Sequence, residues 1–205
     1  MPRIITITNQ KGGVGKSTLA LNLYACFKEL NMPTALVDAD PQGSLHDFAR
    51  LSALELLEPP EDLTALTTLD AYKFILVDTP PYLSSQVPTL VGISDLVLVP
   101  CGVGVPDALA IEHTLELIRE HLPEDGQAAI VLNRGRYATR GFVQELRKTL
   151  PRYDEPVLGH DGHRAHRLRT QRHARGRVQR HGREGADGDP RADGGGAELD
   201  CLIYS

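Results

Sequence analysis

Two lysines lie in a glycine-rich segment near the N-terminus, with the spacing of a phosphate-binding loop. The segment follows a short β-branched run, Ile4–Thr8, and precedes apolar residues at helical spacing. Glycines allow backbone N–H groups to turn inward around phosphate oxygens, and the positive end of the following helix adds to the attraction. The general pattern G-x-x-x-x-G-K-[ST] is met only loosely, because the glycines are shifted. We expect these residues to bind nucleotide phosphates: Gly12, Gly13, Val14, Gly15, Lys16, Ser17 and Thr18.

Lys16 and Ser17 have the most specific chemistry in this loop. A lysine at this position reaches the β- and γ-phosphates, and the hydroxyl that follows it ligates Mg²⁺. The alternative interpretation is a glycine-rich turn without a ligand. The position between a strand and a helix favours the first interpretation and predicts ATP with Mg²⁺ as the bound group.

Aspartates follow two further strand-like runs. Asp38-Ala39-Asp40 comes directly after Ala35–Val37, and Asp78 comes directly after Phe74–Val77. Ligands of open parallel sheets bind at the carboxyl ends of the strands, so we expect these carboxylates to lie near the phosphate loop. An aspartate that emerges from a buried strand beside Mg²⁺ can hold the water shell of the metal. Each aspartate could instead be an ordinary cap of a strand end.

The elements that position these residues alternate between strands and helices. The strands are short, apolar on both faces and separated by helices, which predicts an α/β fold: a doubly wound, mostly parallel sheet with helices on both faces. The stretch Leu51–Asp70 is broken by Pro59-Pro60, and we expect a helix followed by a loop there. The other expected elements are strands at Leu96–Pro100 and Ala128–Leu132 and helices at Ser17–Asn31, Asp107–Leu122 and Thr139–Leu150.

Length and cysteine usage agree with one compact domain. The chain has 205 residues, which is the size of a single α/β domain. We see no signal-peptide pattern, and no apolar stretch approaches the ~20 residues that cross a bilayer. The three cysteines lie far apart, which indicates a reduced cytoplasmic protein. We expect Cys26 and Cys101 to be small core residues.

The composition changes abruptly after Gly159. Residues 1–159 hold 13 Lys and Arg against 20 Asp and Glu, whereas residues 160–205 hold nine Arg, no Lys and seven acids. We therefore divide the chain into a domain at 1–159 and an atypical Arg/His/Gly-rich tail at 160–205, which we expect to be irregular because it has little apolar surface to bury. The tail could be a flexible basic segment that binds nucleic acid. We favour a second hypothesis: such a mixture is what a GC-rich gene yields when it is read out of frame.

Three motifs in this order, KGGVGKST, VDADPQ and FILVDTPP, resemble those of the ParA/MinD family of deviant Walker A P-loop ATPases. The resemblance covers roughly residues 3–159. It implies that Lys11 reaches across a dimer interface to the partner's nucleotide, so that catalysis by Lys11, Lys16 and Asp40 depends on dimerisation, much as with an arginine finger. It also implies that Asp40 orients or activates the attacking water.

The resemblance assigns further residues to the site. It implies that Asp38 supports the metal region and that Asp78, with Ser17, holds Mg²⁺. Asn133-Arg134 matches the position where the family often contacts adenine. Pro106-Asp107 resembles a segment near the dimer interface and the nucleotide.

The function implied by this resemblance is an ATP-dependent dimerising switch that partitions or positions DNA or a large protein cargo. The ATP-bound dimer is expected to bind DNA without sequence preference, and a ParB-like activator or cargo adaptor is expected to stimulate a weak ATPase. The protein would be cytoplasmic and associated with the nucleoid in its ATP state. The basic residues that could contact DNA are Arg134, Arg136, Arg140, Arg147, Lys148 and Arg152.

Two other functions on the same fold stay open. A MinD-like, membrane-associated regulator of division-site placement needs a C-terminal amphipathic anchor, and Leu199–Ser205 is too short for one. A metabolic P-loop ligase of the dethiobiotin synthetase kind is the other. The second lysine and the PQGS sequence after Asp40 favour the partition function over both.

Overall fold

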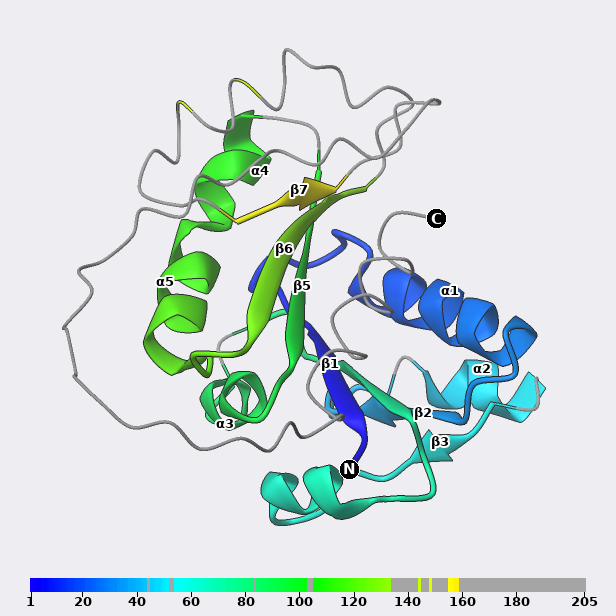
Figure 1. The fold of residues 1–205 in the computed structure, drawn as a ribbon. Coiled ribbons are helices and arrows are strands. Elements are labelled where there is room, and N and C mark those ends of the chain that lie inside the picture. The colour runs from blue at the N-terminus through cyan, green and yellow to red at the C-terminus, as the bar shows by residue number, and fades with distance from the viewer. Residues whose placement is uncertain are drawn as a thin grey trace, which may run out of the picture.

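A parallel sheet of seven strands forms the centre of the part of the chain that the structure describes (Figure 1). The computed structural model describes residues 1–43, 45–51, 54–82, 84–102, 105–133 and 155–158, together with 144 and 148. The strand order is β3-β2-β4-β1-β5-β6-β7, and every pair is parallel. The strands are β1 (Arg3–Ile7), β2 (Thr34–Asp38), β3 (Leu56–Leu57), β4 (Phe74–Asp78), β5 (Leu96–Cys101), β6 (Gln127–Leu132) and β7 (Val157–Leu158).

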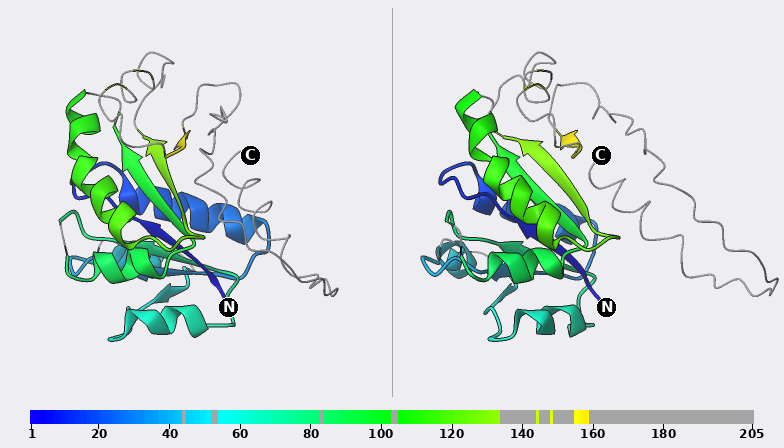
Figure 2. Two further views of the ribbon diagram at one scale, coloured as in Figure 1. Left: turned by 60° about the vertical axis from the view of Figure 1, so that its left-hand side comes forward. Right: turned by 90° about the vertical axis from the view of Figure 1, so that its left-hand side faces the viewer.

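Helices cover both faces of this sheet, as Figure 2 shows in two further views. Helix α1 (Lys16–Glu29) packs on one face, where Phe27 lies against Phe74 of β4 with ring centroids 4.5 Å apart. The 3₁₀-helix η1 (Leu63–Thr68) and two α-helices, α3 (Val87–Gly92) and α5 (Glu112–His121), pack on the other. The predicted doubly wound α/β fold is therefore confirmed.

Strand β4 illustrates why the strands are continuous apolar runs in the sequence. Phe74 and Leu76 face α1, whereas Ile75 and Val77 face the opposite core, and all four are nearly completely buried. Successive side chains of a strand point to opposite faces, so a strand with helices on both sides is apolar throughout.

The sheet register places the carboxyl ends of the central strands side by side. Asp78 at the end of β4 is level with Ile7 of β1 on one side and with Asp38 of β2 on the other. The loop that follows β1 therefore emerges next to Asp78, and Asp38 lies one strand further along the same edge. This edge is where open parallel sheets bind ligands.

Two predicted elements were wrong. The single helix expected over Asp107–Leu122 is two helices, α4 (Val105–Ala110) and α5, separated at Ile111. Ile111 is fully buried in the same core as Leu115 and Ile118, so the apolar spacing continues through the break and conceals it.

The second error concerns Leu51–Asp70, expected as a helix followed by a loop. The structure has α2 (His46–Leu51), the two-residue edge strand β3 and η1 instead. Asp62 begins η1 by accepting the Thr64 N–H at 3.0 Å. Strand β3 is held by its neighbour, with the Leu36 N–H donating to the Glu55 carbonyl at 2.9 Å.

The two described cysteines differ from each other. Cys101 is buried, as expected, and burial raises the pKa of its thiol to about 12. Cys26 is exposed on α1, so the expectation that it is a core residue was wrong.

In the described ranges, no helix is long and apolar enough to span a bilayer. The helix expected at Thr139–Leu150, apart from residues 144 and 148, and the whole tail at 160–205 lie outside these ranges.

Candidate nucleotide-binding site

The glycine-rich loop leaves β1 and enters α1 in a conformation that requires glycine at two positions. Gly13 and Gly15 have φ values of 72° and 95°, in the left-handed region that side chains rarely adopt. A side chain on Gly15 would also overlap the amide of Asn133. Helix α1 then begins with a hydrogen bond from the Leu19 N–H to the Gly15 carbonyl at 2.9 Å. The turn thus places the N-terminus of α1, the positive end of its dipole, at the carboxyl ends of the central strands.

Two asparagines, one after β1 and one after β6, hold this loop in place. Asn9 is 1% exposed; its amide donates to the Pro100 carbonyl at 2.8 Å, and its oxygen accepts the Lys11 N–H at 2.9 Å. Asn133, at the end of β6, donates to the Val14 carbonyl at 3.0 Å. Asn133 was predicted to contact adenine; the structure places its amide against the backbone of the phosphate loop.

Lys16 is the buried cation of the site. It is 7% exposed, and its Nζ lies 3.5 Å from the carbonyl oxygen of Lys11. Burial lowers the pKa of its ammonium group, and the nearby carboxylates of Asp78 and Asp40 act in the opposite direction. A buried ammonium group is stabilised by anionic partners, so the loop is suited to phosphate.

Asp78 lies across from this lysine and is 1% exposed. Burial raises the pKa of its carboxyl to about 6, although a hydrogen bond from the Ser17 side chain acts to lower it. Its Oδ1 atom has no hydrogen-bond partner among the described residues. The buried carboxylate oxygen of Asp78 lacks a partner and lies next to the Ser17 hydroxyl. Mg²⁺ prefers oxygen ligands of this kind, and the metal or one of its waters would supply the missing partner. The two residues therefore fit the metal that the sequence predicts.

Asp38 is engaged differently from Asp78. One oxygen accepts the Asp40 N–H at 3.1 Å, and the other accepts the Leu45 N–H at 2.9 Å. Both oxygens are thus used to order the loop after β2. Within that loop, Asp40 accepts the Gln42 N–H at 3.0 Å. In this arrangement Asp38 holds the backbone that carries Asp40.

A cavity of about 240 Å³ joins the three motifs. It opens between the glycine-rich loop, the loop after β2 and the loop after β4. The structure therefore brings Asp40, from the loop after β2, to the same place as Lys16 and Ser17 at the start of α1. Its lining consists of Gly13, Gly15, Lys16, Ser17, Thr18, Asp40, Thr79 and Pro81.

Lys11 does not line this cavity. Its Nζ lies 2.5 Å from Oδ1 of Asp107 in α4, in an ion pair within the same chain. The prediction placed both residues near a dimer interface but did not pair them. Of the other predicted positions, Lys148 is described, whereas Arg134, Arg136, Arg140, Arg147 and Arg152 lie outside the described residues.

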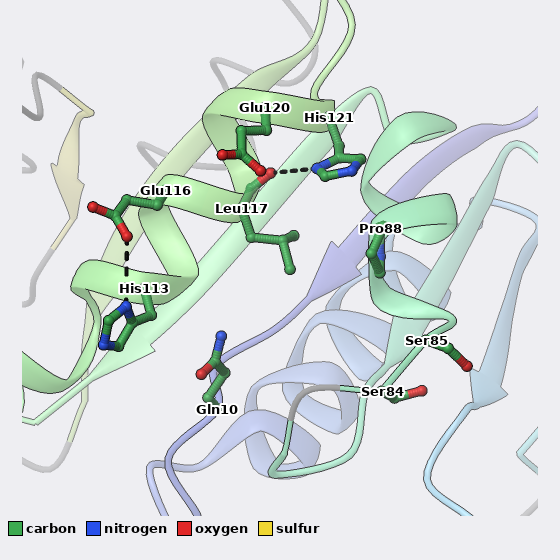
Figure 3. Close-up of a pocket in the computed structure, with 9 residues that line it drawn as sticks. All are labelled: Gln10, Ser84, Ser85, Pro88, His113, Glu116, Leu117, Glu120 and His121. Atoms are coloured by element: carbon green, nitrogen blue, oxygen red, sulfur yellow. Dashed lines mark hydrogen bonds and ion pairs between the residues drawn. The ribbon is translucent and has the colours of Figure 1, made fainter.

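A second, larger cavity of about 680 Å³ lies between the start of α3 and α5 (Figure 3). Figure 3 shows His113 and Glu116 side by side on α5, with His113 Nδ1 3.5 Å from a Glu116 oxygen. Gln10 also lines it, and the backbone N–H of Gln10 lies 3.4 Å from the Thr114 hydroxyl oxygen. Gln10 directly precedes the phosphate loop, but none of the described residues predicted to be catalytic, to bind nucleotide or to hold metal lines this cavity.

Comparison with known proteins gives a consistent picture. The CobQ/CobB/MinD/ParA nucleotide binding domain matches residues 5–161. A maintenance of carboxysome distribution protein A from Gloeobacter kilaueensis is 32% identical over 156 residues, which are 73% of this chain and 71% of that protein. The chromosome partitioning protein ParA of Myxococcus xanthus is 32% identical over 173 residues, which are 60% of this chain and 61% of that protein.

Solved structures share the fold. A plasmid partition protein from Borrelia burgdorferi superposes with a TM-score of 0.58 at 23% identity, covering 77% of this chain and 88% of that one. Cobyrinic acid a,c-diamide synthase from Mycobacterium smegmatis, with bound ADP and magnesium, has a TM-score of 0.59 at 24% identity and covers 77% of this chain and 85% of that one. At these identities the likeness shows the fold alone.

Proposed function

The chain belongs to the CobQ/CobB/MinD/ParA family of nucleotide-binding domains, and from this premise we propose that it is an ATP-dependent dimerising ATPase that partitions or positions DNA or a large protein cargo. The observation that carries the proposal is the cavity in which the glycine-rich loop, Asp40 and the loop after β4 meet. Relatives named for carboxysome distribution and chromosome partitioning support the choice of cargo positioning over ligase chemistry.

Each group of the site has a distinct task in this proposal. Bound ATP with Mg²⁺ supplies the phosphoanhydride whose hydrolysis resets the switch. Lys16 and the backbone N–H groups of the loop bind the phosphates. Ser17 and Asp78 hold the metal and its water shell. Asp40 orients the attacking water, and Asp38 keeps the loop of Asp40 in place through its two backbone hydrogen bonds.

Dimerisation couples this site to cargo. Lys11 of one subunit is proposed to reach the phosphates of the ATP bound to the other subunit. ATP thereby stabilises the dimer, and hydrolysis of that ATP allows the subunits to separate. The dimer then binds DNA through Lys and Arg contacts to phosphates, without sequence preference and with a strong dependence on salt. A ParB-like activator or adaptor accelerates hydrolysis and thereby ends DNA binding.

DNA binding by the Asp40→Ala variant tests the proposal. This variant should retain ATP without hydrolysing it, so we expect it to bind unrelated DNA sequences with ATP and not with ADP at physiological salt. Lys16→Ala, which should bind neither nucleotide productively, is the negative control. The exposed Asp125→Ala variant should behave as wild type. Equal DNA binding with ATP and ADP would refute the nucleotide switch.

A further inference from the structure

The ion pair between Lys11 and Asp107 joins two segments that are 96 residues apart in the chain. Lys11 belongs to the phosphate loop, and Asp107 belongs to the first turn of α4. The lysine side chain is 41% exposed and the aspartate side chain is 25% exposed, so the pair lies at the surface with its carboxylate partly covered. Lys11 Nζ therefore has a carboxylate acceptor in its own chain.

The backbone beneath Asp107 leaves room for this carboxylate. A Cβ atom on Gly102, directly after β5, would overlap a carboxylate oxygen of Asp107 and come within 2.7 Å of its Cγ. Gly102 does not have a positive φ, so space rather than backbone conformation is what an alanine there would disturb. Asp107 is thus seated over a position where any side chain would displace it.

We propose that Asp107 is the positioning residue of Lys11 and acts as a latch: it holds the lysine within its own subunit until a partner with bound ATP offers phosphates in its place. The inference rests on the proposed function, because a lysine that must reach another subunit has first to leave its own carboxylate. Asp107 then sets the ATP and protein concentrations at which the dimer forms.

The competition has a predictable size. A partly exposed ion pair raises the equilibrium constant between its closed and open states by about 2- to 5-fold. Two such pairs open when two subunits associate, so loss of the latch should lower the dimer dissociation constant by the square of that factor, about 4- to 25-fold. Nucleotide affinity of the monomer should stay unchanged, because Lys11 does not line the cavity that holds the phosphates.

Two variants remove the latch by different routes. Asp107→Asn takes away the charge, and Gly102→Ala displaces the carboxylate without altering either partner. Their matched controls are Asp125→Asn, on an exposed aspartate, and Gly92→Ala, where an added Cβ would lie at an ordinary 3.7 Å from the nearest backbone oxygen. Urea denaturation verifies that each variant is folded.

The first measurement follows Lys11 itself in the nucleotide-free monomer. Limited acetylation with mass spectrometry reports how often the Lys11 amine is free of its carboxylate. Both latch variants should increase acetylation of Lys11 by about 2- to 5-fold, with no change at other lysines or in the controls. Unchanged acetylation of Lys11 would overturn the proposal without bearing on dimerisation.

The second measurement is sedimentation velocity with the non-hydrolysable analogue AMP-PNP. Both latch variants should dimerise at lower protein concentration than wild type, and the difference should vanish when each is combined with Lys11→Ala. Weaker dimerisation, or the same shift in the Lys11→Ala background, would overturn the latch, since Asp107 would then act across the interface or through folding. A wild type that stays monomeric with AMP-PNP while the acetylation difference persists would refute the proposed dimerising switch and still support Asp107 as the residue that positions Lys11.

Discussion

Replacing Asp78 with asparagine should make the nucleotide-free protein more stable while it destroys the metal site. Burial raises the pKa of this carboxyl from 3.8 to about 6, which corresponds to about 3 kcal/mol at ~1.4 kcal/mol for each unit of pKa. That energy is the cost of keeping a buried charge near neutral pH. Because asparagine removes the charge but weakens the hydrogen bond with Ser17, we expect a net gain of about 1–3 kcal/mol in the free energy of unfolding at pH 7.5.

The sign of the pH dependence gives this prediction its test. The native state keeps the Asp78 proton up to about pH 6, whereas the unfolded chain releases it near 3.8. Between these values the native state binds more protons, so the contribution of Asp78 to stability falls as the pH rises through this window. The advantage of Asp78→Asn over wild type should therefore be large at pH 7.5 and small near pH 4.

Urea denaturation of the two proteins at several pH values, without nucleotide or Mg²⁺, measures this difference. Other carboxylates titrate in both proteins, so their effects cancel in the comparison. Adding Mg²⁺ and ADP should then stabilise wild type more than the variant. A variant that is no more stable than wild type at pH 7.5, or whose advantage persists unchanged at pH 4, would refute the assignment of Asp78 as a buried carboxylate that awaits a cation.

Two further substitutions probe the loops around the cavity. Gly15→Ala places a side chain at φ 95° and against Asn133. Urea denaturation should therefore show a loss of about 1–3 kcal/mol in the free energy of unfolding, and ADP titration should show a loss of affinity above about 10-fold. Adding Asn133→Ala should recover part of the stability, and a Gly15→Ala variant as stable as wild type would contradict the loop geometry. Asp38→Asn leaves one backbone N–H without its acceptor, so the ATPase rate should fall while Mg²⁺-dependent ADP binding stays within about 3-fold of wild type. Loss of the Mg²⁺ dependence would instead make Asp38 a metal ligand.

The central strands could be predicted because their patterns are local. Strand β4 is apolar on both faces and ends at an aspartate, and both features are visible in five consecutive residues. The same holds for β1 and the glycines that follow it. The two-residue strands β3 and β7 have no such pattern. They exist because an adjacent strand offers free backbone groups, which is a property of the sheet and not of their own sequence.

Roles within the site depend on contacts that no spacing along the chain reveals. Asp38 and Asp78 look alike in the sequence, each at the end of a buried strand. They differ because the loop after Asp38 folds back and donates two N–H groups to it, while Oδ1 of Asp78 has no such donor among the described residues. The hydrogen-bonding capacity of the first carboxylate is thereby used by the backbone, and the second keeps the need for a cation.

The phosphate loop depends on the strand order in a similar way. Asn9 reaches β5 across 91 residues, and Asn133 reaches the loop across 119. Lys11 meets Asp107 only because β5, which precedes α4, lies directly beside β1. A sequence motif can therefore identify the lysine, but its partner in the resting subunit follows from which strand neighbours β1. In the proposed latch, the same strand order that builds the nucleotide site also determines when Lys11 becomes free to reach a partner.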